Sequence, residues 1–310
     1  MLIRQRHGLS LAMRTRLCRL AVVGLALSLS TAALAVKVVS EKTLPGFKFP
    51  ESCAYDAQAK VLYVGSFGGT ELKPGEKDGN GYISKVSLDG KMIEERFLPM
   101  AGVTMNKPKG IWVAGNRLWV PDIDGVWVFD TQTRRGKKLA LPDAQFANDA
   151  AIVGSTLYIS DNRKDALFSV TPADFLDMSD SPKVELVWSD KNINPNGLYP
   201  AADGTLLIVG FKSDKERRGV YSMMPGRELK AISKEIGRLD GLYRMRDGTL
   251  LVTDWDTGRV LTWTATDGPT AIASDFKGPA DLCAFPNAGG LMVVVPDLVK
   301  SELRLIQLGN

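Results

Sequence analysis

The hydrophobic positions of this chain recur in a long repeating unit. Each unit opens with a small or polar residue, continues with a short apolar strand and a turn containing Gly, Asn or Asp, and then has a strand of the form Leu-hydrophobic-Val. A period of about 40–50 residues is typical of propellers and solenoids. Six units are visible, and they open at Glu51, Lys109, Asn148, Asn196, Asp240 and Ala280.

Each unit holds enough apolar runs for four strands. In the second unit, for instance, Gly125–Phe129 and Lys137–Leu141 follow the first two strands. Six four-stranded units predict an all-β fold, a six-bladed β-propeller. The sixth unit stops after its third strand, Glu302–Leu308. We predict that Val36–Val39 and its neighbours supply the missing strand, because pairing the N-terminal strand with the last blade closes the ring and removes exposed edges.

The first 35 residues follow another pattern. Five arginines precede an apolar run, Leu20–Leu29, which ends in Ala33-Leu34-Ala35. This is the pattern of a secretory signal peptide with a small-residue cleavage site. We therefore predict a leader at 1–35, a propeller domain at 36–310 and a periplasmic or secreted protein. The alternative is an uncleaved membrane anchor, although the run of about ten residues is short of the ~20 that span a bilayer.

Removing the leader changes the charge of the chain. The whole sequence has a formal net charge of +4, and the leader holds five arginines and no acidic residue, so the remainder carries −1. A nearly neutral body without a basic run offers no footprint for nucleic acid or anionic lipid. We expect neither nucleic acid nor, after cleavage, membrane as a partner.

Histidine and cysteine are scarce. The single histidine, His7, lies in the leader, which excludes histidine-dependent catalysis and histidine–metal sites from the mature chain. Cys53 and Cys283 remain after cleavage. They open the first and last blades, which are neighbours in a closed ring, so they can form a disulfide in an oxidising compartment or remain as two buried thiols.

The six opening residues share one position at the start of the innermost strand, and innermost strands converge on the axis. Four of them carry oxygen, namely Glu51, Asn148, Asn196 and Asp240. An all-oxygen set with two carboxylates suits a hard cation such as Ca²⁺, or Mg²⁺ or Mn²⁺. The alternative interpretation is that Asn-Gly, Asp-Gly and Asn-Asp are turn dipeptides.

Three other features have competing interpretations. Lys109 either orients an anionic substrate group or is a solvated lysine in a turn. The polar insertion Gly68–Gly81 is either a mobile surface loop or a flap over the tunnel mouth. The tryptophans fill space between blades, or one or two serve as a substrate platform. Aspartates that end the second strands are expected to accept backbone N–H bonds, and these are Asp122, Asp161, Asp254 and Asp297.

These residues resemble the motifs of the gluconolactonase, regucalcin and luciferin-regenerating enzyme family of calcium-dependent six-bladed propellers. The resemblance spans the mature chain, and it is carried by Pro50-Glu51, Phe146-Ala-Asn148-Asp149, Pro195-Asn196-Gly197-Leu198 and Leu239-Asp240-Gly241-Leu242. It implies metal ligands from blades one, three, four and five. More distantly the layout is similar to paraoxonases and diisopropyl fluorophosphatase, which use a histidine that this chain lacks.

Two positions depart from the family pattern. Sugar-lactone members carry arginine where this chain has Phe146, so a guanidinium that binds sugar hydroxyls is replaced by an apolar ring. Blade one reads Pro-Glu-Ser-Cys where the family has Pro-Glu-Gly. The resemblance therefore implies retained metal chemistry with a less hydroxylated substrate.

The expected function is a calcium-dependent lactonase or esterase acting on a small-molecule lactone or ester. Asp240 is the expected general base, with Glu51 as second choice, while Lys109 and Phe146 are the expected substrate contacts. The alternative is a calcium-stabilised propeller that binds a ligand or protein without catalysis. A carbon–carbon bond-forming propeller similar to strictosidine synthase is a third possibility.

Overall fold

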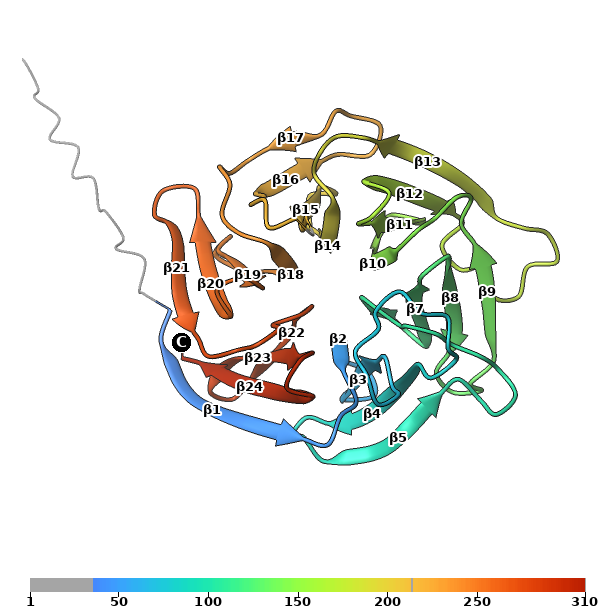
Figure 1. Cartoon of the computed structure of the whole chain (residues 1–310), viewed down its shortest axis with the longest axis horizontal. Helices are drawn as coiled ribbons and strands as arrows, with labels where there is room; N and C mark the ends of the chain where they lie inside the picture. The colour runs from blue at the N-terminus through green and yellow to red at the C-terminus, as the bar shows by residue number, and fades with distance from the viewer. Residues whose placement is uncertain (1–35, 213, 310) are drawn as a thin grey trace, which may run out of the picture. The chain divides into compact units, whose positions relative to one another are not determined.

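The computed structural model describes residues 36–212 and 214–309, so the predicted leader at 1–35 lies outside the described residues. The described chain forms six four-stranded antiparallel sheets arranged around a central axis (Figure 1). The predicted all-β six-bladed propeller is confirmed. No helix in the described ranges is long and apolar enough to cross a membrane.

Each blade is numbered from its innermost strand outward. Blade one contains β2 (Pro50–Asp56), β3 (Val61–Ser66), β4 (Tyr82–Ser87) and β5 (Met92–Leu98). Blade two contains β6 (Trp112–Ala114), β7 (Arg117–Asp122), β8 (Gly125–Asp130) and β9 (Gly136–Ala140). Blade three contains β10 (Ala147–Val153), β11 (Thr156–Asp161), β12 (Ala166–Thr171) and β13 (Lys183–Ser189).

The second half of the ring follows the same order. Blade four contains β14 (Pro195–Pro200), β15 (Leu206–Gly210), β16 (Val220–Met223) and β17 (Lys230–Ala231). Blade five contains β18 (Leu239–Arg244), β19 (Leu250–Asp254), β20 (Arg259–Thr264) and β21 (Gly268–Ala273). Blade six contains β22 (Cys283–Asn287), β23 (Gly290–Asp297), β24 (Glu302–Leu308) and β1 (Val38–Pro45).

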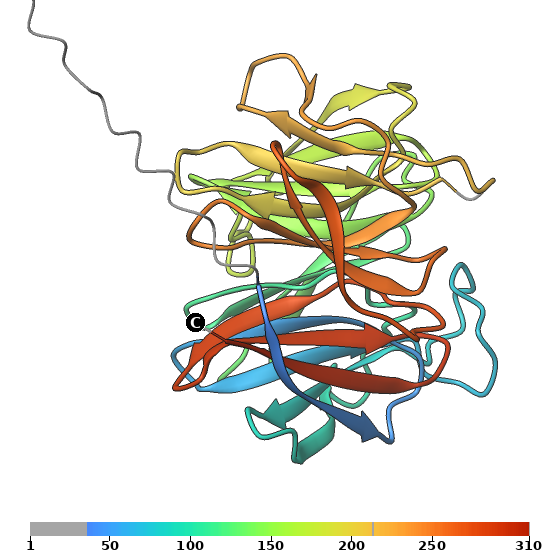
Figure 2. The same cartoon turned by 90° about the vertical axis from the view of Figure 1, so that its left-hand side faces the viewer.

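The N-terminal strand closes the ring as predicted. β1 pairs antiparallel with β24 from Val38 opposite Leu308 to Pro45 opposite Glu302. It begins two residues later and runs further than the predicted Val36–Val39, and it lies at the outer rim beside β24 (Figures 1 and 2). Most of its side chains face solvent, but Leu44 is buried in the cluster shared by blades one and six. The first and last segments of the chain thus complete a single sheet.

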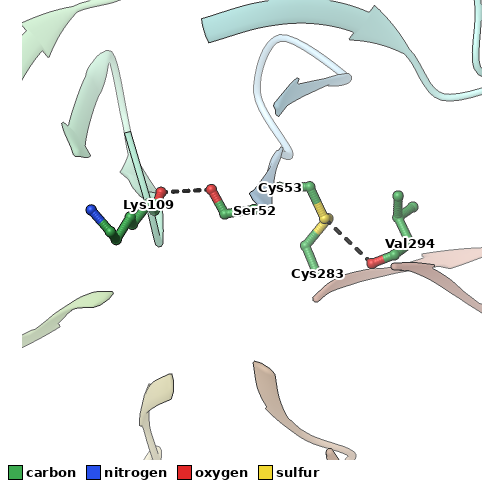
Figure 3. The surroundings of a disulfide bond; sticks show 5 residues. All are labelled: Ser52, Cys53, Lys109, Cys283 and Val294. Carbon is green, nitrogen blue, oxygen red and sulfur yellow. Dashed lines mark hydrogen bonds between the residues drawn. A yellow bond between two sulfur atoms is a disulfide. The ribbon is translucent and has the colours of Figure 1, made fainter. Parts of the chain in front are cut away.

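A disulfide joins the same two blades near the axis. The structure links Cys53 in β2 to Cys283 in β22, with their Cα atoms 5.5 Å apart, which is an ordinary spacing for a disulfide. Figure 3 shows the bridge beside Ser52 and Val294. Cys53 Sγ lies 3.4 Å from the Val294 carbonyl oxygen, and because a disulfide sulfur carries no hydrogen this is a contact only. Of the two alternatives for the cysteines, the structure has the disulfide.

The hydrophobic core fills the spaces between neighbouring blades. One cluster joins Leu62 and Val64 of blade one to Val294 and Leu305 of blade six. Trp119 belongs to the cluster between blades two and three, as expected for a tryptophan that fills space between blades. Trp112 and Trp188 are only partly buried beside their clusters. The blades therefore hold one another in place, so that the ring is stable only when it is closed.

We expect deletion of Val38–Pro45 to destabilise the whole ring. The deletion removes the fourth strand of blade six, exposes the hydrogen-bonding edge of β24 and removes the buried Leu44. Urea denaturation should show a lower free energy of unfolding than for the full mature chain, with a larger loss than for Val39→Ala, whose side chain is exposed. Unchanged stability and solubility of the truncated protein would contradict closure by β1.

We also expect the disulfide to contribute about 2–5 kcal/mol to the free energy of unfolding, because it closes a loop across 230 positions of the sequence. The Cys53→Ala, Cys283→Ala double variant should show this loss in urea denaturation. Dithiothreitol should lower the stability of the wild type and leave the double variant unchanged. Two alkylatable thiols in the unfolded, unreduced wild type would show that the bridge is absent.

Candidate metal and substrate site at the propeller axis

The four predicted ligands share one structural position. Glu51, Asn148, Asn196 and Asp240 are each the second residue of an innermost strand, in β2, β10, β14 and β18. All four side chains are buried. In blades two and six the corresponding Lys109 and Ala280 precede β6 and β22 by three residues. We call these six positions the axis residues.

Asn196-Gly197 and Asp240-Gly241 lie within strands, so the interpretation of these dipeptides as turns is wrong. Their glycines serve close contact between blades. A Cβ on Gly197 would lie 2.2 Å from the Asp240 carbonyl oxygen, and one on Gly241 would lie 2.4 Å from the Leu282 nitrogen. Any larger residue would push the blades apart.

The backbone carbonyls of the axis residues are bound by the preceding blade. Three accept hydrogen bonds from hydroxyls, and these bonds are Ser52 Oγ to Lys109 (2.6 Å, Figure 3), Ser160 Oγ to Asn196 (2.7 Å) and Thr253 Oγ1 to Ala280 (3.0 Å). Two accept from backbone amides, Gly110 to Asn148 (2.8 Å) and Asp281 to Glu51 (3.0 Å). The sixth carbonyl, of Asp240, is the one approached by Gly197. With their backbones fixed in this way, the axis residues keep their side chains for other partners.

The aspartates that end the second strands also position the axis residues. Asp161 accepts hydrogen bonds from the backbone amides of Gln145 (2.7 Å) and Phe146, just before Asn148. Asp297 accepts from Lys277 (2.8 Å) and Gly278 (3.0 Å), just before Ala280. Asp122 and Asp254 bind the segments before Lys109 and Asp240 in the same way. The predicted role of these residues as backbone acceptors is confirmed.

Three of the four predicted ligands have a buried oxygen without a hydrogen-bond partner among the described residues. These atoms are Glu51 Oε2, Asn196 Oδ1 and Asp240 Oδ1. Leaving a buried acceptor unpaired costs about 1–3 kcal/mol, and more when it is charged. A hard cation that takes oxygen ligands would satisfy all three atoms. The described part of the chain has no metal-holding group of three or more His, Cys, Asp or Glu, since this set pairs two carboxylates with two amides.

The carboxylates at the axis resist ionisation. Burial raises the pKa of Asp240 to about 8, and the charge of Asp149 adds to this shift, whereas the nearby Asn196 amide opposes it. Burial also raises the pKa of Glu51, with Asp240 as the next cause. Lys109 lowers it. The site therefore favours its charged form only when a further positive charge is present.

Lys109 is fully buried, so the interpretation of it as a solvated lysine is wrong. Its ammonium nitrogen donates to the Lys107 carbonyl oxygen (3.2 Å) and lies 4.1 Å from the centre of the Phe146 ring. Burial lowers the pKa of Lys109 to about 8, and the charge of Glu51 opposes that shift. The two predicted substrate contacts, Lys109 and Phe146, therefore touch each other.

The insertion Gly68–Gly81 is tied to the ring near this site. Asp78 binds the buried Lys107 (2.6 Å), and Lys77 pairs with Asp124 (2.5 Å). Leu72 packs on a small apolar cluster that contains the axis residue Ala280. Figure 2 shows the segment between β3 and β4 standing out from one face of the ring. These anchors favour the flap over the mobile surface loop.

Several residues near the axis were not predicted. Asp149 and Asp281 are buried carboxylates that follow the axis residues of blades three and six, so the same alignment, read one position further, contains them. Burial raises the pKa of Asp149 to about 7, and burial followed by the charge of Asp149 raises the pKa of Asp281. Arg163 lies over the other face of Phe146, 4.1 Å from the ring centre, and no sequence pattern signals that stacking.

Comparison with known proteins supports the fold. No protein-family model matches the sequence, and no curated protein matches it significantly. A solved streptogramin B lyase is similar with a TM-score of 0.56 and 15% identity, covering 87% of this chain and 98% of the lyase. Selenomethionine-substituted virginiamycin B lyase from Staphylococcus aureus has a TM-score of 0.56 and 11% identity, covering 86% and 99%. At these identities the likeness extends to the architecture of the propeller.

Proposed function

We propose that this protein is an exported calcium-dependent hydrolase of lactones or simple esters. The observation that carries the proposal is the set of buried, unpartnered oxygens of Glu51, Asn196 and Asp240 at one end of the axis. Two carboxylates and two amides, without nitrogen or sulfur donors, match the preference of Ca²⁺, and Mg²⁺ or Mn²⁺ are the other candidates. The family resemblance of these motifs points in the same direction.

The roles of the residues follow from their chemistry. A divalent cation, when bound, polarises an ester carbonyl and stabilises the negative charge that develops during attack by water. Asp240 takes the proton of the attacking water, because a raised pKa near the operating pH suits a general base. Asn148 and Asn196 are ligands without proton chemistry, since amides do not titrate in this range.

Lys109 and Phe146 define the substrate side of the site. The buried ammonium of Lys109 sits against the Phe146 ring and has no carboxylate within ion-pair distance among the described residues. It is therefore placed to orient the carbonyl or an anionic group of a substrate. Phe146 offers an apolar surface where sugar-lactone enzymes have a guanidinium, so alkyl or aromatic lactones should react faster than gluconolactone.

The structural neighbours argue against a lyase reaction here. A histidine-to-alanine variant of the S. aureus virginiamycin B lyase, solved with quinupristin, is described as catalytically inactive; it matches this chain with a TM-score of 0.53 and 13% identity over 86% of this chain and 99% of the lyase. That loss of activity ties the lyase to a histidine. Residues 36–310 of this chain contain no histidine.

The first expected outcome concerns stability and pH without metal. Asp149 and Asp240 have folded-state pKa values of about 7 and 8, above the ~3.9 of an unfolded Asp. Between these limits the folded state holds protons that the unfolded state has released. The free energy of unfolding should therefore fall as pH rises from about 4 to about 8, by up to about 1.4 kcal/mol per pH unit for each carboxyl, and then level off.

Calcium should offset that loss. Urea denaturation of metal-free protein at pH 5 and pH 8, with and without CaCl₂, tests this, and Ca²⁺ should stabilise the protein far more at pH 8. A hundredfold excess over the dissociation constant corresponds to about 2.7 kcal/mol. Asp240→Ala should weaken the response. Identical curves with and without calcium at pH 8 would rule out the site.

The second expected outcome concerns catalysis. Asp240→Asn keeps an oxygen ligand but cannot accept the proton, so turnover of an aromatic lactone at saturating calcium should fall by about 10²–10⁴-fold. Glu51→Gln is the matched control, since it also removes one ligand charge, and it should lose calcium affinity but keep more turnover. If the wild type hydrolyses no lactone or ester above the buffer rate, the calcium-stabilised binding propeller becomes the better interpretation.

A further inference from the structure

A cavity lies on the axis beyond the predicted ligands. Its volume is about 210 Å³, and its lining comes from the innermost strands of all six blades. Most lining residues follow the axis residues by two to four positions. Because a strand rises about 3.3 Å per residue, the centre of the cavity lies roughly 10 Å further along the axis than the ligands. It is therefore a separate site on the same axis.

Four aromatic side chains surround this cavity. Tyr55, Trp112, Tyr199 and Tyr243 come from blades one, two, four and five, and each is only partly buried. Tyr199 and Tyr243 pack edge to face with ring centres 5.4 Å apart. The faces of Trp and Tyr rings attract cations, and quaternary ammonium ions are recognised by such groups of rings. The wall of the cavity thus suits a ligand that is both apolar and positively charged.

Two buried carboxylates lie at the end of the cavity nearer to the axis residues. Asp149 and Asp281 both line it, and both are more than nine-tenths buried. Asp149 accepts hydrogen bonds from the amides of Ala150 (2.7 Å) and Leu198 (2.6 Å). No side-chain donor and no Lys or Arg partner binds Asp281 within the part of the chain that the structure describes. A buried carboxylate without a counter-charge is costly, so its position in a cavity points to a cationic ligand.

The charges around the axis agree with this assignment. Glu51, Asp149, Asp240 and Asp281 are buried carboxyl groups, and Lys109 is the buried cation beside them. A divalent cation at the proposed metal site still leaves one negative charge uncompensated when all four are ionised. The cavity offers the place where a single positive charge would offset it.

We propose that this cavity binds a small quaternary ammonium compound. The charged nitrogen lies toward Asp281 and Asp149, and its methyl groups contact the four aromatic rings. An alkylated nitrogen has no N–H to satisfy, which fits rings and carboxylates better than a lattice of hydrogen-bond acceptors. The volume is below the ~300–1,000 Å³ of sites for drug-sized ligands, so the ligand is of choline size.

Titration calorimetry with choline tests the proposal on the full mature protein, free of divalent ions and without any ester. The neutral isostere 3,3-dimethylbutan-1-ol has the same shape without the charge, and it should bind at least tenfold more weakly. Tetramethylammonium should compete with choline, and K⁺ should not. Equal binding of the neutral isostere would indicate a merely apolar cavity, and equal competition by K⁺ an inorganic cation site; either result overturns the proposal.

Asp281→Asn removes the charge with little change of shape and should weaken choline binding at least tenfold. The matched control is Asp143→Asn, a change at an exposed carboxylate away from the cavity, which should leave binding unchanged. Unchanged affinity of the Asp281 variant, or no heat with choline for the wild type, would refute the site. If the Asp281 variant does not fold, the wild-type comparison of choline with its isostere still decides. Because no lactone or calcium enters this test, its outcome is independent of hydrolase activity.

Discussion

The structure depends on one constraint, which is that every axis residue is held through its backbone carbonyl by the blade before it. Ser52, Ser160 and Thr253 supply hydroxyls for three of these carbonyls, amides bind two more, and Gly197 allows close approach to the last. Buried carbonyls must find donors, and here they find them in the neighbouring blade rather than in side chains at the axis. That arrangement leaves carboxylates and amides concentrated on the axis without competing partners.

The repeat in the sequence predicted most of this architecture. Six units of alternating apolar runs, with an incomplete last unit, were enough to predict the blade number, the closure by the N-terminal strand and the common position of Glu51, Asn148, Asn196 and Asp240. These are consequences of local periodicity, which a sequence carries directly. The glycines of Asn196-Gly197 and Asp240-Gly241 were ambiguous, because a turn and a close contact between blades both require glycine.

The remaining features of the site depend on contacts between distant segments. Lys109 is buried because Phe67, Phe146 and the anchored insertion surround it, and none of those contacts follows from its own Pro-Lys-Gly context. The stacking of Arg163 on Phe146 likewise joins two loops with no shared pattern. Asp149 and Asp281 become neighbours only when blades three and six face each other across the axis. Their mutual repulsion is a property of the closed ring.

The closing seam has a consequence for how this protein can be made. β1 is the first described strand to be synthesised, and its partner β24 is the last, while the Cys53–Cys283 bridge joins the same two blades near the centre. A ribosome therefore releases nearly the entire chain before either connection can form. Folding must be completed after translation, and until then the nascent chain exposes unpaired strand edges of the kind that chaperones shield.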